Sequence, residues 1–264
     1  MRALFVGAMV LATLAPAVAS AQRVTPTLST TMQRTCQGET GAHVTFDASG
    51  QRSTEPQRST DSRSFRAERA GAGYRFVQSA LQPHGDVTLT ADVAANGQVT
   101  GAMLSGAGFE AGVAASPTPI DVPALAASLA VEIPERLLVN RSFAVGDQYY
   151  PPELRDTLIS QMTSALGFPF PINGSINIPF QGRTTIDGND VLVWEGELTM
   201  SGAGLINDAP VTLQSVSRVR VVHDAATGLV RTYRTAQDFN LQVGGQPFLA
   251  QSSFDSYVCQ IVPQ

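Results

Sequence analysis

The sequence predicts a mainly β protein, with antiparallel meanders that form a curved sheet, either one half-barrel or two related half-barrels, and one or two short covering helices. Strand-like segments recur between turn signals at the spacing typical of β-sandwiches and barrels. In Val87–Val93 the apolar residues fall on one face, and Asn96-Gly97 just beyond it is a hairpin signal. Few segments have a helical period, which disfavours a parallel α/β architecture.

Residues 1–21 are expected to be a signal peptide. Arg2 supplies a positive charge, residues 3–14 form an apolar run, and Ala19-Ser20-Ala21 fits a cleavage site, with Ala17-Val18-Ala19 as an alternative. The run is too short for a transmembrane helix, and no later stretch reaches about 18 apolar residues. We therefore expect a periplasmic or secreted protein with no transmembrane segment after signal removal.

The charge balance disfavours one class of partner. All 17 basic residues are arginine, and removal of Arg2 leaves 16 Arg against 22 Asp plus Glu, a net charge of −6. A mildly acidic chain without basic blocks is a poor candidate for nucleic-acid binding. We expect no nucleic-acid partner.

Two cysteines lie near the two ends of the expected mature chain, Cys36 and Cys259. An oxidising compartment allows them to pair, and the disulfide would tie the two ends together. In the chain-entropy model a loop of this size contributes about 5 kcal/mol of stability. The alternative is two separate buried thiols.

Residues 22–63 are expected to be a polar N-terminal arm and loop. Residues 22–35 are rich in threonine, residues 43–46 offer one short strand, and residues 47–61 have no apolar period. Six arginines fall between Arg52 and Arg75. They form either a patch for an anionic envelope component or the solvated face of a loop and a strand.

Residues 64–131 are expected to form a first β meander and a short helix. A small-residue loop is expected over residues 107–119. The helix is expected over Val122–Val131, with Asp121 as its N-cap and with Leu125 and Leu129 on one face. The strands are expected at residues 64–68, 74–77, 87–93 and 99–104.

Residues 132–264 are expected to comprise a junction, an amphipathic helix and a second β meander. The junction, Glu132–Pro152, breaks at Gly146-Asp147. A helix is expected over Pro152–Leu166, because its apolar residues form one stripe, and Gly167 is placed to end it. Strands are expected at residues 175–186, 191–198, 211–222 and 229–236, with a last hairpin over residues 238–261.

Three short motifs resemble a group of uncharacterised exported bacterial β-rich proteins, in which two meanders flank a V-G-D-x-W-like junction. The motifs are Ile133-Pro134, Phe143-Ala144-Val145-Gly146-Asp147 and Ala226–Val230, and Tyr149 stands where a tryptophan is usual. These proteins are similar in fold to the half-barrels of envelope lipoprotein carriers, where a sheet wraps helices and an apolar hollow. The resemblance implies a lipid-like ligand by fold analogy.

The sequence has none of the common motifs for catalysis, nucleotides or metals. We expect no cofactor, no metal and no enzymatic activity. His223-Asp224 could belong to a Ser-His-Asp site, although a solvated turn is the favoured interpretation. Asp187, Asn189 and Asp190 could bind Ca²⁺, but no bidentate Glu is suitably placed, and an ordinary hairpin turn is favoured.

The middle of the chain concentrates aromatic residues, and four of them are candidate ligand-binding residues: Tyr149, Tyr150, Phe180 and Trp194. They line a concave pocket in one interpretation and fill the core in the other. The preferred function is an exported, non-catalytic envelope protein that binds an apolar or lipid-like ligand or an envelope protein partner. The alternatives are a structural or assembly factor of the envelope and a hydrolase with an unrecognised site.

Overall fold

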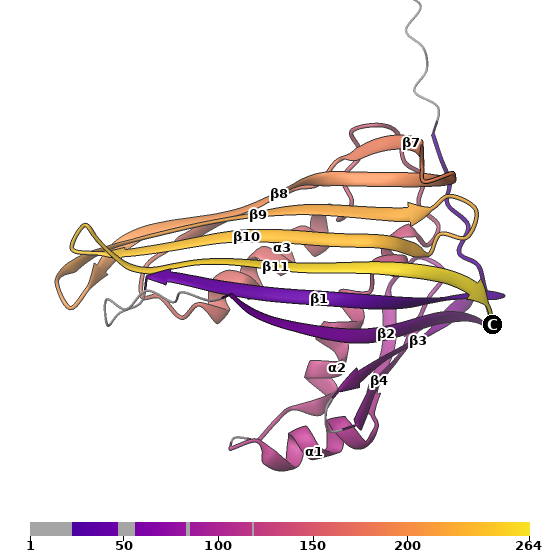
Figure 1. Ribbon diagram of the computed structural model, residues 1–264, viewed down its shortest axis with the longest axis horizontal. Coiled ribbons are helices and arrows are strands. Elements are labelled where there is room, and N and C mark those ends of the chain that lie inside the picture. Colours follow the sequence, from indigo (N-terminus) through magenta and orange to yellow (C-terminus); the bar gives the residue numbers. More distant parts are fainter. Residues whose placement is uncertain (1–22, 47–55, 83–84, 118) are drawn as a thin grey trace, which may run out of the picture.

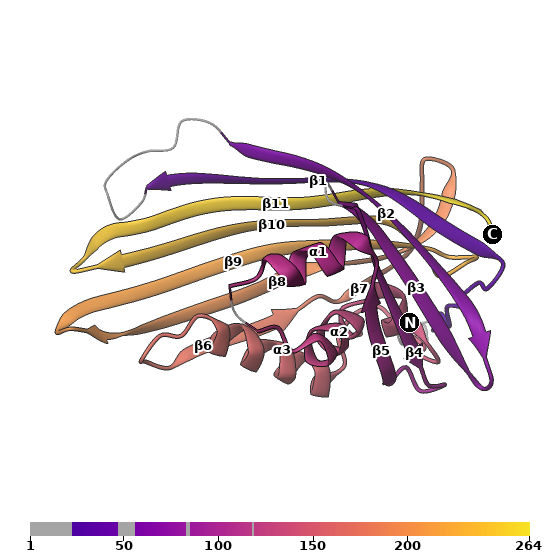
Figure 2. The ribbon, with the colours of Figure 1, turned by 90° about the horizontal axis from the view of Figure 1, so that it is seen from below.

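The computed structural model describes residues 23–46, 56–82, 85–117 and 119–264. Over these residues eleven strands form one antiparallel sheet, in the order β5-β4-β3-β2-β1-β11-β10-β9-β8-β6, with β7 also paired to β8. The sheet stays open, with β5 at one edge and β6 and β7 at the other. It is strongly curved, and the helices lie on its concave side (Figures 1 and 2). The predicted curved antiparallel sheet is confirmed, and both predicted meanders belong to one continuous sheet.

The first half of the sheet contains β1 (Met32–Phe46), β2 (Gln57–Ala70), β3 (Gly73–Gln82), β4 (Gly85–Val93) and β5 (Val99–Ser105). The helical segments follow: α1 (Ala107–Ala115), α2 (Val122–Val131), η1 (Pro134–Leu138) and α3 (Pro152–Ala165). The second half contains β6 (Ile172–Asn177), β7 (Phe180–Ile186), β8 (Asn189–Ile206), β9 (Ala209–Asp224), β10 (Val230–Val243) and β11 (Gln246–Pro263).

Strand β1 joins the two halves, because it pairs with β2 on one side and with β11 on the other. The expectation of a polar arm is therefore wrong over β1 and the start of β2. The reason lies in the inward-facing positions of β1, which hold Arg34, Cys36 and Gly38 and so show no apolar alternation. Neighbouring strands on both sides satisfy its backbone, which makes the strand stable without apolar side chains. Residues 47–55 of the expected loop lie outside the described residues.

Helix α1 replaces the loop expected over residues 107–119. Its sequence is rich in alanine, the residue with the strongest helix propensity. A Cβ at Gly108 would meet the backbone of Gly85, so the absence of a side chain lets α1 approach the start of β4 closely.

The two predicted helices are confirmed, but α2 is oriented differently from its apolar pattern. The Asp121 side chain caps α2 by accepting a hydrogen bond from the Ala124 amide at 3.0 Å. Ala126 and Ala130 are fully buried in the core shared with β3, β4 and β5, whereas Leu129 is 37 % exposed. Small residues on the packed face let the helix lie close to the sheet, and the leucines of the helix stay partly exposed.

Three apolar clusters hold the helices against the concave face. The largest lies under the junction and includes Phe143, Tyr149 and Trp194. The second joins α2 to the first meander, and the third lies beneath Phe168 and Phe170 near the tips of β8 to β11. None of the helices in the described ranges is long and apolar enough to cross a bilayer.

Candidate functional site

A cavity of about 540 Å³ lies between the concave face of the sheet and the helices α2, η1 and α3. Its volume falls within the range of roughly 300–1,000 Å³ that is usual for ligand pockets. Its wall is mainly apolar, and its aliphatic side chains include Leu89, Leu104, Leu129, Leu158, Met162 and Ile176. Both halves of the chain therefore contribute to one hollow.

The strands reach the cavity with every second residue, because successive side chains of a strand point to opposite faces. On β11 the residues that do so are Asp255, Tyr257 and Cys259. Helix α3 adds Leu158 and Met162, which are half-buried and lie across the cavity from the sheet.

The four candidate ligand-binding residues lie close together, but two of them line the cavity and the other two fill the core. Tyr149 and Tyr150 line the cavity, with ring centroids 5.3 Å apart. Phe180 and Trp194 are 2 % and 0 % exposed, and their rings pack at a tilt in the core with centroids 4.7 Å apart. Neither belongs to the cavity wall, because Phe143 and Tyr149 of the junction cover Trp194.

A buried ion pair anchors η1 to the centre of the sheet. The Arg34 Nε donates to Glu135 Oε1 at 2.5 Å, and the Val230 amide donates to the same oxygen at 3.1 Å. The Val230 amide is available because the pairing of β10 with β9 shifts register there. Burial acts to raise the pKa of the Glu135 carboxyl, but the charge and hydrogen bonds of Arg34 outweigh it, and the pKa is lowered.

His223 is buried at the end of β9, so the interpretation of a solvated turn is wrong. Its Nδ1 donates to the Gly228 carbonyl and its Nε2 accepts from the Tyr149 hydroxyl, both at 2.9 Å. Burial lowers the pKa of His223 to about 4, which keeps the ring neutral at pH 7. Both ring nitrogens are thus engaged by groups other than serine or carboxylate, while His84 lies outside the described residues.

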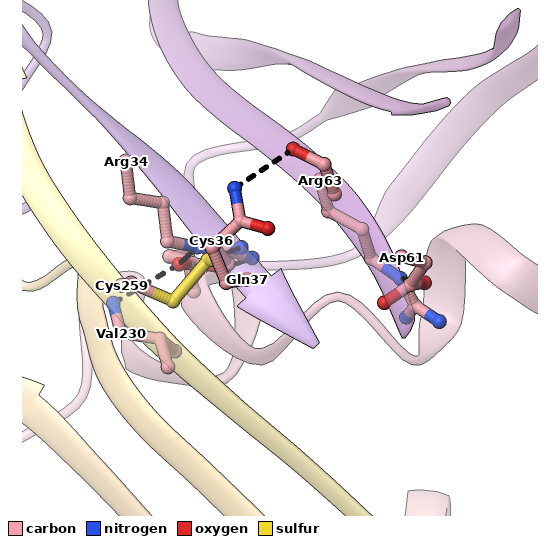
Figure 3. Close-up of a disulfide and its surroundings, with 9 residues drawn as sticks. Arg34, Cys36, Gln37, Asp61, Arg63, Val230 and Cys259 are labelled. Atoms are coloured by element: carbon pink, nitrogen blue, oxygen red, sulfur yellow. Dashed lines mark hydrogen bonds and ion pairs between the residues drawn. A yellow bond between two sulfur atoms is a disulfide. The ribbon is translucent and has the colours of Figure 1, made fainter. Parts of the chain in front are cut away.

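The predicted disulfide is confirmed. Cys36 and Cys259 occupy directly paired positions on β1 and β11, and their bond joins the two ends of the described chain. Figure 3 shows the guanidinium of Arg34 beside this bond, with Arg63 and Asp61 on the neighbouring strand β2. A disulfide is in keeping with an exported protein.

Neighbouring side chains offset the charges of the arginines on β2 and β3. The described ion pairs are Arg58–Glu39, Arg63–Asp61, Arg66–Glu68 and Arg75–Asp92. Arg69 lies over the Tyr74 ring. This arrangement matches a solvated, charge-balanced strand surface more closely than an anion-binding patch; Arg52 lies outside the described residues.

The acidic turn between β7 and β8 is an ordinary hairpin. Asp187 and Gly188 adopt positive φ, and the Asp190 carboxylate forms an ion pair with Arg183. In the described ranges no group of three or more His, Cys, Asp or Glu is arranged to hold a metal ion.

Several residues of the cavity wall carried no signal in the sequence: Arg34, Arg63, Gln78, Tyr233, Asp255 and Tyr257. They come from strands far apart in the chain, and only the pairing of β1 with β11 brings them together. No protein-family model matches the sequence, and no curated protein matches it.

Proposed function

We propose that this chain is an exported, non-catalytic envelope protein, periplasmic or secreted, that holds an apolar or lipid-like ligand between its sheet and its helices. One observation carries the proposal: a cavity of about 540 Å³ with a mainly apolar wall lies under α2, η1 and α3. An apolar chain would remove this wall from water at a gain of about 25 cal/mol per Å² of apolar surface. The likeness to envelope lipoprotein carriers supports the same ligand class by analogy.

The helices give this proposal a physical route for ligand entry. The apolar side chains of α3 that face the cavity are only half-buried, and α2 meets the sheet through alanines. Helices with so little buried apolar area separate from a sheet at a lower cost than tightly packed ones. The sheet, by contrast, is fixed by continuous backbone pairing and by the disulfide.

The experiment begins with the protein purified from an exporting bacterial host. Native mass spectrometry and organic extraction identify any bound lipid, and a fluorescent fatty-acid analogue measures binding to the delipidated protein. The variant Ala80→Phe places a ring in the cavity from β3, and Ala203→Phe adds the same ring at an exposed position of β8.

We expect Ala80→Phe to weaken binding of the analogue by about tenfold or more, and Ala203→Phe to leave it unchanged. Equal binding by both variants, or the absence of any lipid and any binding, would refute the proposal. Circular dichroism and thermal melting of both variants establish that each one folds.

A further inference from the structure

Most of the surface of the cavity wall is apolar, but tyrosines and charged side chains also line it. Four of the five tyrosines of the chain line it: Tyr149, Tyr150, Tyr233 and Tyr257. The rings of Tyr233 and Tyr257 lie with centroids 6.5 Å apart on paired positions of β10 and β11. Aromatic faces grouped in this way attract cations through the ring quadrupole.

The two arginines of the cavity wall are already neutralised. Arg34 is bonded to Glu135, and the Arg63 Nε lies 2.7 Å from Asp61 Oδ2. Arg63 also lies over the Tyr257 ring, with its Cζ 4.2 Å from the centroid. An anionic ligand would have to displace Glu135 to reach Arg34, and at Arg63 it would meet a guanidinium whose charge Asp61 already offsets.

Two carboxylates of the same wall are left without a counter-ion. Among the described residues, neither Glu132 nor Asp255 has an ion-pair partner within 4.0 Å, and Oδ1 of Asp255 is buried without a hydrogen bond. Glu132 is the C-cap of α2, where the helix dipole already presents negative charge. The buried oxygen of Asp255 is unfavourable until a cation arrives, whereas Glu132 is exposed and adds a second negative charge to the same wall.

Both carboxylates act on one tyrosine. Burial raises the pKa of Tyr233, and electrostatic interaction with Tyr150, Asp255 and Glu132 raises it further. Burial likewise raises the pKa of the Glu132 and Asp255 carboxyls. Glu132, Asp255 and the four tyrosines all line this one cavity.

We infer that the ligand of this cavity is an amphiphile with an ammonium group at its polar end, bound beside Tyr233 by Glu132 and Asp255. The inference rests on the proposed function, since Leu129, Leu158 and Met162 would hold the apolar chain. The ammonium would interact with the tyrosine faces and neutralise the two carboxylates. A carboxylate or phosphate at the same place would add to the unpaired negative charge.

The test uses three probes with the same dodecyl chain: dodecyltrimethylammonium and dodecanoate below their micelle concentrations, and dodecanol below its solubility limit. Calorimetric titration compares the wild-type protein with Glu132→Gln, Asp255→Asn and the double variant. Glu110→Gln is the matched control, because it removes one negative charge from the exposed surface of α1.

We expect the wild-type protein to bind dodecyltrimethylammonium about tenfold more tightly than it binds dodecanol or dodecanoate. The double variant should lose most of this preference and bind dodecanol within about twofold of wild type. Glu110→Gln should behave as the wild-type protein does. If Asp255→Asn does not fold, Glu132→Gln alone and Tyr150→Leu provide the same comparison.

The outcomes separate the two proposals. If no dodecyl probe binds, the proposed apolar-binding function fails and the inference fails with it. If dodecanol binds but the ammonium probe binds no better than dodecanoate, the function stands and the ammonium inference is overturned. A preference that survives in the double variant, or that Glu110→Gln removes equally, also overturns it.

A fourth probe, dodecylphosphocholine, distinguishes the source of the ammonium. Binding as tight as that of dodecyltrimethylammonium supports the inference with a zwitterionic lipid headgroup as the ligand. Much weaker binding supports it with a simple alkylammonium compound.

Discussion

Arg34 of β1 and Glu135 of η1 form an ion pair that is almost completely removed from solvent, with side-chain exposures of 7 % and 0 %. The pair connects residues 101 positions apart and fixes η1 to β1, the strand that joins the two halves of the sheet. Because the Val230 amide shares the same carboxylate, three elements meet at one group. The position of the junction over the sheet therefore depends on Glu135.

Removal of Glu135 should destabilise the fold strongly. Glu135→Ala leaves Arg34 buried without a counter-ion, and we expect a loss of about 3–5 kcal/mol in the free energy of unfolding. The double variant Arg34→Met with Glu135→Leu should be more stable than Glu135→Ala, because it leaves no buried charge. Urea unfolding followed by the fluorescence of the buried Trp194, the single tryptophan of the chain, measures both. A single variant at least as stable as the double one would contradict this account.

His223 should make the protein sensitive to mild acid. Its folded-state pKa of about 4 lies below the ordinary value of 6.5, so between these two pH values the unfolded chain binds a proton that the folded chain does not. Stability should therefore fall as the pH falls from 6.5 to 4, by about 3 kcal/mol in total. Urea unfolding at a series of pH values measures the effect.

His223→Asn is the matched variant for this measurement, since its amide can still donate to the Gly228 carbonyl. The raised pKa values of Glu132 and Asp255 act in the opposite direction, because protonation of those groups favours the folded state. Glu132 and Asp255 are present in both proteins, so the difference between the two stability curves reports His223 together with its effect on the pKa of Glu135. Parallel curves would rule out His223 as the origin.

The disulfide should contribute to stability chiefly by restricting the unfolded chain. Cys36 and Cys259 are separated by 223 positions, and reduction should lower the free energy of unfolding by up to about 5 kcal/mol. Guanidinium unfolding with and without a reductant measures this loss. The double variant Cys36→Ala with Cys259→Ala should start less stable and should not respond to the reductant. A reductant effect of the same size in that variant would have another origin.

The orientation of α2 predicts a larger loss of stability for a substitution at Ala130 than for one at its neighbour Leu129. Ala130→Leu inserts volume where the helix packs on the sheet and should cost about 1–3 kcal/mol. Leu129→Ala removes a side chain that is 37 % exposed and should cost less than about 1 kcal/mol, while it weakens binding of the apolar probe. Thermal unfolding and probe titration of both variants test the pair. The reverse order of stabilities would mean that the helix is rotated.

Sequence reasoning succeeded where the signal was local. The cap of α2 at Asp121, the end of α3 at Gly167 with φ of 64°, and the pairing of the two cysteines each follow from one residue type in one setting. The turns at Asn96-Gly97 and Asp187-Gly188 were predicted for the same reason, whereas the Asn207-Asp208 turn between β8 and β9 was not. Such features depend on backbone geometry that few residue types can adopt, so the residue type alone predicts them.

It failed where long-range pairing decides the outcome. Strand β1 carries Arg34, Cys36 and Gly38 on its inner face, and only its partners β2 and β11 make that face part of a core. Aromatic content alone did not distinguish Trp194, which fills the core, from Tyr150, which lines the cavity. The unpaired carboxylate of Asp255 likewise depends on neighbours that come from distant strands.

Gly38 offers the sharpest test of how β1 supports the cavity. A Cβ at this position would overlap Oδ1 of Asp61 and the ring of Tyr257, which meet across the strand because glycine leaves the space empty. Gly38→Ala should displace both side chains, cost about 1–3 kcal/mol of stability and alter probe binding, since Tyr257 lines the cavity. Gly112→Ala on α1 meets nothing within 4 Å and should instead raise stability by about 0.5–1 kcal/mol, because alanine favours the helix. Chemical unfolding of the two variants should therefore give changes of opposite sign, and a Gly38→Ala protein as stable as wild type would show that Tyr257 and Asp61 do not depend on this glycine.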